Sequence, residues 1–186
     1  NIGAKGQICV GGLAATWAAL TLPGWLALPG ALLAAFLAGG LWMIVPAFLK
    51  IKRGVSEVIT TLLMNYVGLY LVSYFVHGPL REPSPTGSIS LPQSAAIPEY
   101  GRLPLLLPGV SRLHGGIILA VILAGVVWLI MQRTTWGYRL RMVGMNPKCT
   151  SYLGLNTEAI LLSGMLLSGA IAGLGGASEI MGAQFR

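Results

Sequence analysis

Residues 132–156 read QRTTWGYRLRMVGMNPKCTSYLGLN, a basic and polar segment between two long apolar runs. Within it, Asn146 is a good helix N-cap and Pro147 suits the first helical position. Gly154 suits the left-handed residue that ends a helix. Together these signals predict a helix of about two turns in the middle of the segment.

The predicted short helix has one apolar face. Cys149, Tyr152 and Leu153 follow i, i+3, i+4 spacing, so their side chains share that face. A helix of this length is unstable on its own in water. The rest of the chain or a second protein must therefore hold the face.

The composition of the chain is that of an integral membrane protein. Of its 186 residues, 55% are hydrophobic and only 9% are charged, and the mean hydropathy is +0.76, which does not fit a soluble surface. The formal net charge is +7. The basic residues cluster beside apolar runs, as the positive-inside rule requires, rather than on one polar face, which argues against a nucleic-acid partner.

Apolar runs predict an all-α, polytopic transmembrane helix bundle of about five spans in a lipid bilayer. The expected spans are residues 8–22, a run that ends near 49, and residues 55–76, 115–131 and 158–181. The first is short for a span of about 20 residues, as expected if it starts partway into the bilayer. Basic residues place the end near 50 and the segment 132–157 in the cytoplasm. Residues 77–114 hold seven of the eleven prolines and predict an ordered external loop.

The third expected span carries a polar stripe. Glu57, Thr61, Asn65 and Gly68 recur on one helical face, which should not meet lipid. Glu57 lies near the basic end, so it either reaches the cytoplasmic surface, where Arg53 could pair with it, or lines a pore. Asn65 lies deeper and is the better pore candidate.

The fifth expected span is rich in glycine. Gly169 and Gly173 form a GxxxG motif, and Gly164 and Gly176 lie on either side of it. Small residues at such spacing let two membrane helices approach closely. These four glycines therefore predict close helix packing.

The sequence contains no residue pattern for a disulfide framework, a metal site or nucleotide hydrolysis. Two cysteines build neither a disulfide framework nor a metal motif, and two distant histidines, His77 and His114, are interpreted as solvated loop residues, so we expect no metal and no cofactor. No GxxxxGK[ST] loop occurs, so any nucleotide hydrolysis belongs to a partner. The chain begins at Asn1 and ends at Arg186 directly after an apolar run. We interpret residues 1–186 as a single transmembrane domain, truncated at both ends.

Four stretches carry a family resemblance. They are NIGAKGQICVGG (residues 1–12), GVSEVITTLLMNYVGLYLV (54–72), TTWGYRLRMVGMNPKCTSYLGLN (134–156) and LSGMLLSGAIAGLGGASEIMG (162–182). They cover about half of the chain and resemble, in order and spacing, the membrane permease subunits of bacterial ABC importers. That branch includes branched-chain amino acid, ribose and nucleoside permeases, and residues 54–72 are most similar to the nucleoside and simple-sugar members.

The resemblance implies a function and a set of partners. It implies a non-enzymatic permease subunit in the bacterial plasma (inner) membrane that forms the translocation path for a small polar solute, a nucleoside or simple sugar. ATP hydrolysis then occurs on an ATP-binding cassette subunit, which docks on a coupling helix in the cytoplasmic segment. A second permease subunit, the same chain or a different one, completes the path, and an extracytoplasmic solute-binding protein delivers the solute.

Site residues follow from the resemblance and the polar pattern together. The residues expected to contact the ATP-binding subunit are Arg141, Asn146, Pro147, Cys149, Tyr152, Leu153 and Gly154. Those expected near the solute path are Asn1, Gln7, Glu57, Thr61 and Asn65. Lys148, Cys149 and Thr150 stand where the family more often has small residues, which could alter the partner contact.

Three alternatives remain. An ion-coupled secondary transporter would need a deep carboxylate or histidine relay. Glu57 and Glu179 are the candidates, and both lie near the ends of expected spans. A membrane-embedded enzyme would need a nucleophile and base or a metal cluster. A purely structural membrane protein would explain the glycines but not the capped cytoplasmic helix.

Overall fold

The computed structural model describes residues 2–82, 93–106 and 113–185 of the chain. The α-helices are α1 (Ala4–Thr21), α2 (Ala27–Trp42), α3 (Ile44–Arg53), α4 (Glu57–His77), α5 (Gly116–Arg133), α6 (Thr135–Met145), α7 (Pro147–Tyr152) and α8 (Thr157–Glu179). Two 3-10 turns, η1 (Gly24–Leu26) and η2 (Glu99–Gly101), and one π-helical turn, η3 (Ile180–Gln184), complete the described elements. The predicted all-α helix bundle is confirmed.

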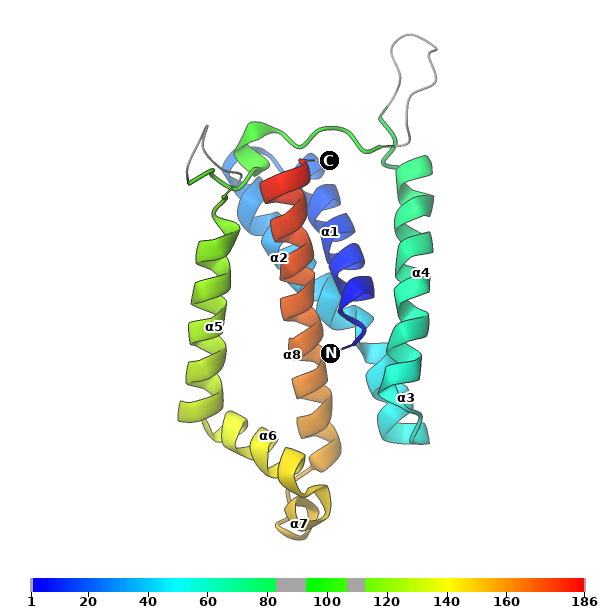
Figure 1. Cartoon of the computed structure of the whole chain (residues 1–186), viewed down its shortest axis with the longest axis vertical. Coiled ribbons are helices and arrows are strands. Elements are labelled where there is room, and N and C mark those ends of the chain that lie inside the picture. The colour runs from blue at the N-terminus through cyan, green and yellow to red at the C-terminus, as the bar shows by residue number, and fades with distance from the viewer. Residues whose placement is uncertain (1, 83–92, 107–112, 186) are drawn as a thin grey trace.

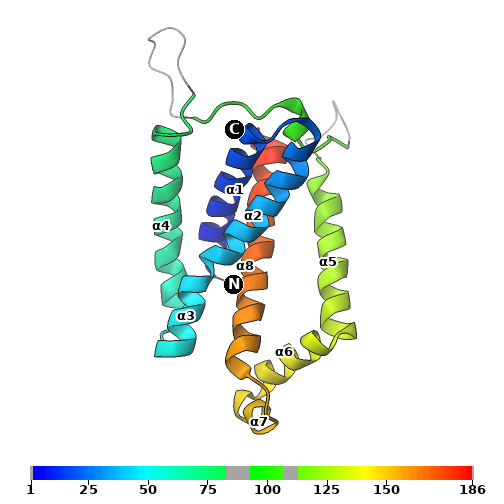
Figure 2. The same cartoon turned by 180° about the vertical axis from the view of Figure 1, so that it is seen from behind.

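The helices form a bundle with a compact centre and two outlying helices. α1, α2 and α8 pack together in the middle, while α4 and α5 stand on opposite sides, as both views show (Figure 1, Figure 2). α6 and α7 lie at one end of the bundle, and the described residues 93–106 cross the other end (Figure 1). The basic residues near the α6–α7 end predict that this end lies in the cytoplasm.

Four stretches of the described chain are long and apolar enough to cross a membrane: Gly24–Arg53, Glu57–His77, Gly116–Arg133 and Thr157–Gln184. α1 is a helix but is not one of them, because its 18 residues include Lys5 and Gln7 near the start. It begins about halfway along the bundle and ends at the outer side (Figure 1). This position agrees with the expectation that the first apolar run starts partway into the bilayer.

Small residues bring the central helices together. Gly169 and Gly173 of α8 lie against the backbone of α2 at Gly39 and Ala35, and Gly176 lies against the backbone of α1 at Ile8. A Cβ atom at any of the three α8 positions would clash with that backbone. Gly164, closer to the cytoplasm, packs against the Leu140 side chain of α6. Close backbone approach is how membrane helices gain packing energy without a hydrophobic driving force between them.

The described part of the external segment is bound to the outer end of the bundle. Ile97 is fully buried, and its N–H donates to the Phe185 carbonyl oxygen at 2.9 Å. The Leu103 N–H donates to the Met181 carbonyl oxygen at 2.9 Å, and the Arg102 guanidinium lies over the Phe185 ring at 4.9 Å. The segment is therefore held to the C-terminal turn by backbone bonds and by a cation–π contact.

The two histidines differ in their exposure to solvent. His77 is exposed, as expected, although it is the last residue of α4 rather than a loop residue. The expectation of a solvated loop residue is wrong for His114. That ring is half-buried, packs against Gly182, and accepts a hydrogen bond from the Gly116 N–H at 3.1 Å through Nδ1. The physical reason is that the first N–H groups of α5 have no partner within the helix and need an acceptor.

Candidate functional site

The short cytoplasmic helix α7 has the capping geometry that its sequence predicts. The Asn146 side-chain oxygen accepts from the Cys149 N–H at 3.1 Å, and Pro147 occupies the first helical position. Gly154 has a left-handed backbone with φ of +72°. The predicted start and end of this helix are confirmed.

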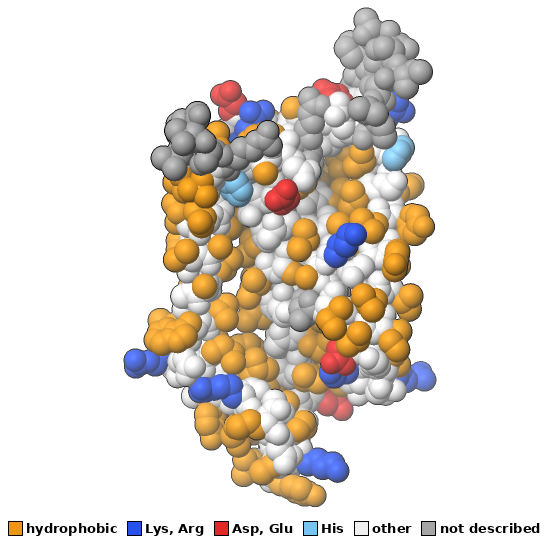
Figure 3. Space-filling view, viewed as in Figure 1, with side chains coloured by type: hydrophobic (Ala, Val, Ile, Leu, Met, Phe, Trp, Pro, Cys, Tyr) orange, Lys and Arg blue, Asp and Glu red, His pale blue; other side chains and the backbone are white. Residues whose placement is uncertain are grey.

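The apolar face of α7 points away from the bundle. Tyr152 is 89% exposed, and Met145 and Leu153 are also largely exposed, as is Cys149. The opposite side, at Thr150, is fully buried. Figure 3 shows hydrophobic side chains at this tip, at the level of the basic residues and beyond them. Nothing in the described part of the chain covers them.

Met145 was not foreseen as part of this surface. It is the last residue of α6 and comes directly before the N-cap of α7. The signal in the sequence was an apolar residue directly before the N-cap of the short helix. We call Met145, Cys149, Tyr152 and Leu153 the cytoplasmic tip.

α6 fixes the tip to the membrane helices. The Trp136 indole N–H donates to the Ser163 hydroxyl of α8 at 3.0 Å, and the Thr134 hydroxyl caps α6 by accepting from the Gly137 N–H at 3.1 Å. Arg141 donates to the Gln132 side-chain oxygen at 3.0 Å, so it links α6 to the inner end of α5. α6 therefore joins the tip to both α5 and α8.

Two ion pairs join the cytoplasmic ends of the helices. Lys50 of α3 pairs with Glu57 of α4 at 2.5 Å, and Lys52 of α3 pairs with Glu158 of α8 at 2.7 Å. The partner of Glu57 is thus Lys50 rather than Arg53. Glu57 is the first residue of α4. This position favours the interpretation that Glu57 lies at the surface rather than in a pore.

The polar stripe of α4 packs on the first turns of α1. The Asn65 side-chain oxygen accepts from the Gly6 N–H at 2.7 Å, and Gly68 lies against Gly6. Thr61 is buried beside Gly3. The stripe therefore faces protein in this structure, and a role of Thr61 and Asn65 in the solute path stays a prediction.

The remaining expected path residues lie apart from these. Gln7 is buried and donates to the Met43 sulfur at 3.1 Å, at the break between α2 and α3. Pro46 follows that break and has no N–H to donate, which is consistent with the interruption. Asn1 lies outside the described residues. The structure therefore does not gather the expected path residues around one space.

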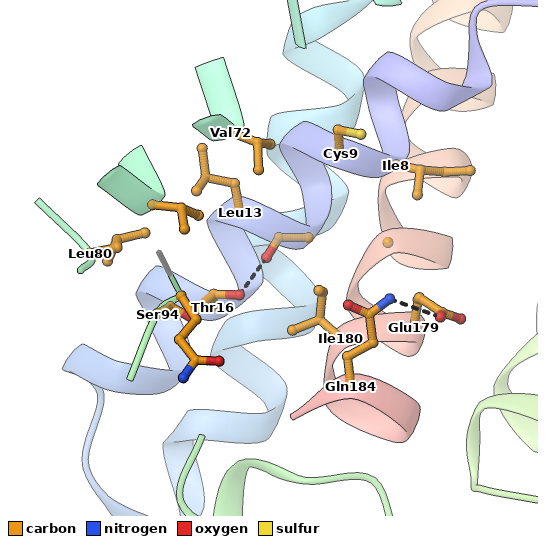
Figure 4. Close-up of a pocket in the computed structure, with 14 residues that line it drawn as sticks. Ile8, Cys9, Leu13, Thr16, Val72, Leu80, Ser94, Glu179, Ile180 and Gln184 are labelled. Atoms are coloured by element: carbon orange, nitrogen blue, oxygen red, sulfur yellow. Dashed lines mark hydrogen bonds between the residues drawn. The ribbon is translucent and has the colours of Figure 1, made fainter. Parts of the chain in front are cut away.

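A cavity of about 570 Å³ lies instead between the outer halves of α1, α4 and α8. Its polar lining includes Thr16 of α1, Ser94 of the external segment, Glu179 of α8 and Gln184 of η3. These side chains surround the space in Figure 4, where the Gln184 amide donates to Glu179 at 3.2 Å. None of Gln7, Glu57, Thr61 and Asn65 lines this cavity. Glu179, a carboxylate at the end of a membrane helix, was the available signal in the sequence.

Comparison with known proteins gives the family. Residues 1–185 match the family model described as "Branched-chain amino acid transport system / permease component". The chain belongs to this family of ABC-importer permeases. It is therefore a multi-pass membrane protein.

Individual relatives of this permease come from several organisms. A guanosine ABC transporter permease protein of Bacillus subtilis is 40% identical over 98% of the chain. A glucose ABC transporter permease protein of Haloferax volcanii is 36% identical over 100% of the chain, and a nucleoside ABC transporter permease protein of Lactococcus lactis is 30% identical over 95%.

The permease chain spans about half the length of these relatives: 52%, 51% and 50% of each, respectively. None of the solved structures matches it.

Proposed function

We propose that this chain is part of the membrane subunit of an ABC importer for nucleosides, with simple sugars as the related class. Similarity to permeases named for guanosine, nucleosides and glucose supports that solute range. The outer cavity supports an entry point, because Glu179, Gln184, Thr16 and Ser94 offer hydrogen-bonding groups to a polar solute. The expected location is a bacterial plasma membrane.

The cytoplasmic tip is the proposed docking site for an ATP-binding cassette subunit. The observation that carries this proposal is an exposed apolar face on a well-capped helix of only six residues, beyond the basic end of the bundle. Such a helix gains little stability from its own hydrogen bonds, and an exposed apolar cluster with a polar surround is typical of a protein contact. A partner that fills the face would stabilise it.

The coupling would run through α6. Closure of the partner's nucleotide-binding domains moves the docked α7, and the bonds of Trp136 and Arg141 pass that movement to α8 and α5. A second permease subunit would face this one across the solute path. An extracytoplasmic binding protein would deliver the solute to the outer end.

Ion-coupled transport has weaker support. Glu57 and Glu158 are engaged in ion pairs at the cytoplasmic end, and Glu179 lies in the last turn of α8 at the outer end. Among the described residues, no carboxylate lies near the middle of a candidate span, where a proton or ion relay would need one.

The test uses the full-length gene expressed in its native membrane. The permease is purified in mild detergent as wild type, as Leu153→Asp, and as Leu105→Asp, which places the same charge at an exposed position in the external segment. We expect an ATP-binding subunit to accompany the wild type and Leu105→Asp but not Leu153→Asp. The absence of such a subunit from all three preparations would overturn the proposed function.

A further inference from the structure

The outer half of α4 exposes a row of aromatic and hydrogen-bonding side chains. Tyr66, Tyr70 and Tyr74 are four residues apart and are 64%, 76% and 67% exposed. Ser73 and His77 are exposed as well, and all five residues fall within an arc of roughly 100° around the helix. We call them the tyrosine face. It points away from α1, which contacts the opposite side of α4 through Asn65 and Gly68.

Two of these tyrosines lie too deep for the aromatic belt at a membrane surface. Tyr74 is one turn from His77 at the outer end of α4, where such a belt is expected. Measured from His77 along the helix axis, Tyr70 lies roughly 10 Å and Tyr66 roughly 16 Å from the outer end of α4. A phenolic hydroxyl at that depth has no partner in hydrocarbon, and burying it without one is unfavourable. Lipid is therefore a poor neighbour for Tyr66 and Tyr70.

Other exposed surfaces of the same molecule have the composition expected of lipid-facing helices. On α5, the exposed side chains include Ile117, Val121, Val126 and Leu129, and between residues 117 and 130 only Trp128 can donate a hydrogen bond. The inner half of α4 is also apolar within the same arc, where it exposes Ile59 and Leu63. On α4 and α5, the exposed tyrosines therefore lie only in the central and outer parts of α4.

We propose that the tyrosine face lines the solute path and that Tyr66 and Tyr70 bind the nucleoside as it passes. This inference rests on the proposed function and adds the residues that recognise the solute. The flat phenol rings would stack on the base, an interaction that tolerates any base because each has a π-face. The Tyr hydroxyls and Ser73 would accept or donate hydrogen bonds to the ribose. In this arrangement the Tyr hydroxyls meet polar groups instead of lipid.

The location of the face can be tested by its access to water. In the full-length permease with every native cysteine replaced by serine, Tyr70→Cys is compared with Val121→Cys. Val121 is 68% exposed on α5 and lies at a similar depth from the outer end, roughly 8 Å along the helix. A charged, membrane-impermeant thiosulfonate is added from outside. We expect Tyr70→Cys to react roughly tenfold faster or more, because the reactive thiolate forms only in water.

Equal and slow labelling of the two cysteines would mean that water reaches neither position, and it would overturn the inference. Faster labelling of Val121→Cys would overturn it too, because the aqueous path would then lie along α5.

Solute recognition can be tested by uptake into proteoliposomes that contain the complete importer. The variants are Tyr70→Phe, Tyr70→Leu and, as a control for loss of an exposed aromatic residue elsewhere, Trp128→Leu on α5. We expect Tyr70→Leu to lower guanosine uptake roughly tenfold, since a base–aromatic stack is lost. Tyr70→Phe should retain most uptake because the ring remains, and Trp128→Leu should behave as wild type.

Uptake measurements distinguish failure of the tyrosine face from failure of the proposed function. If ATP-dependent guanosine uptake is the same in the wild type and in the double variant Tyr66→Leu/Tyr70→Leu, the role of the tyrosine face in solute binding is overturned. The proposed function then still stands. If the same double variant loses glucose uptake but keeps guanosine uptake, the role of the tyrosine face in nucleoside binding is also overturned. A wild-type complex that takes up neither guanosine nor glucose overturns the proposed function itself.

Discussion

Asn65 on α4 caps the start of α1 from a different helix: its side-chain oxygen accepts the Gly6 N–H at 2.7 Å. The first N–H groups of any helix lack partners within it. α1 begins about halfway along the bundle (Figure 1), and Gly6 is buried there against α4, so bulk water does not reach its N–H. The cap thus stabilises a helix start inside the membrane and joins α4 to the central helices.

Replacing Asn65 should therefore weaken the protein. Asn65→Leu leaves the Gly6 N–H without its acceptor, and a buried unpaired donor costs about 1–3 kcal/mol. We expect a lower melting temperature in detergent for Asn65→Leu, while Asn65→Asp, which keeps an acceptor oxygen, should stay closer to wild type. Equal melting temperatures for Asn65→Leu and wild type would contradict the capping role. Lost uptake in a fully stable Asn65→Asp would instead favour a direct role in the solute path.

Two adjacent glycines of α8 provide a matched pair. A Cβ at Gly176 would clash with the Ile8 backbone, whereas at Gly175 the nearest atom would be 4.0 Å away. We expect Gly176→Ala to force α1 and α8 apart and destabilise the bundle by about 1–3 kcal/mol. Gly175→Ala should be neutral or stabilising by up to about 1 kcal/mol, because alanine favours helix. Thermal unfolding of the two variants side by side checks this, and an equal effect of both would rule out the packing explanation.

Local and distant interactions differ in how well the sequence predicts them. The cap of α7 depends on Asn146, Pro147 and Gly154, whose interactions span a few residues, so spacing alone was sufficient. The bond between Gly6 and Asn65 joins residues 59 apart, and no periodicity encodes which helix faces which. The outer cavity is similar, since Thr16, Ser94 and Glu179 come from three separate elements.

The external segment should be anchored by one side chain. Ile97 is fully buried and belongs to the main apolar cluster. Removing most of its side chain in Ile97→Ala should cost about 2–5 kcal/mol locally. We expect limited proteolysis from the outside to cut this segment faster in Ile97→Ala than in Leu105→Ala, whose side chain is exposed. Identical cleavage rates would mean that Ile97 does not hold the segment.

The ion pairs at the cytoplasmic end should add little stability. Lys52 and Glu158 are both more than half exposed, and exposed pairs contribute less than about 1 kcal/mol. We therefore expect Glu158→Gln to change the melting temperature only slightly, and the small change to disappear at high salt. A large, salt-independent loss of stability would show that this pair is a main connection between α3 and α8.

The central claim is that the cytoplasmic tip contacts an ATP-binding subunit. Cys149 is an exposed thiol on α7, so it can carry a photoactivatable maleimide in a full-length permease whose other cysteines are replaced by serine. After illumination of native membranes, we predict one major protein adduct, an ATP-binding subunit identified by mass spectrometry. The same label on Leu105→Cys at the outer side should not give that adduct. If labelled Cys149 reacts only with lipid, or with proteins that lack a nucleotide-binding domain, the docking role of the tip is wrong.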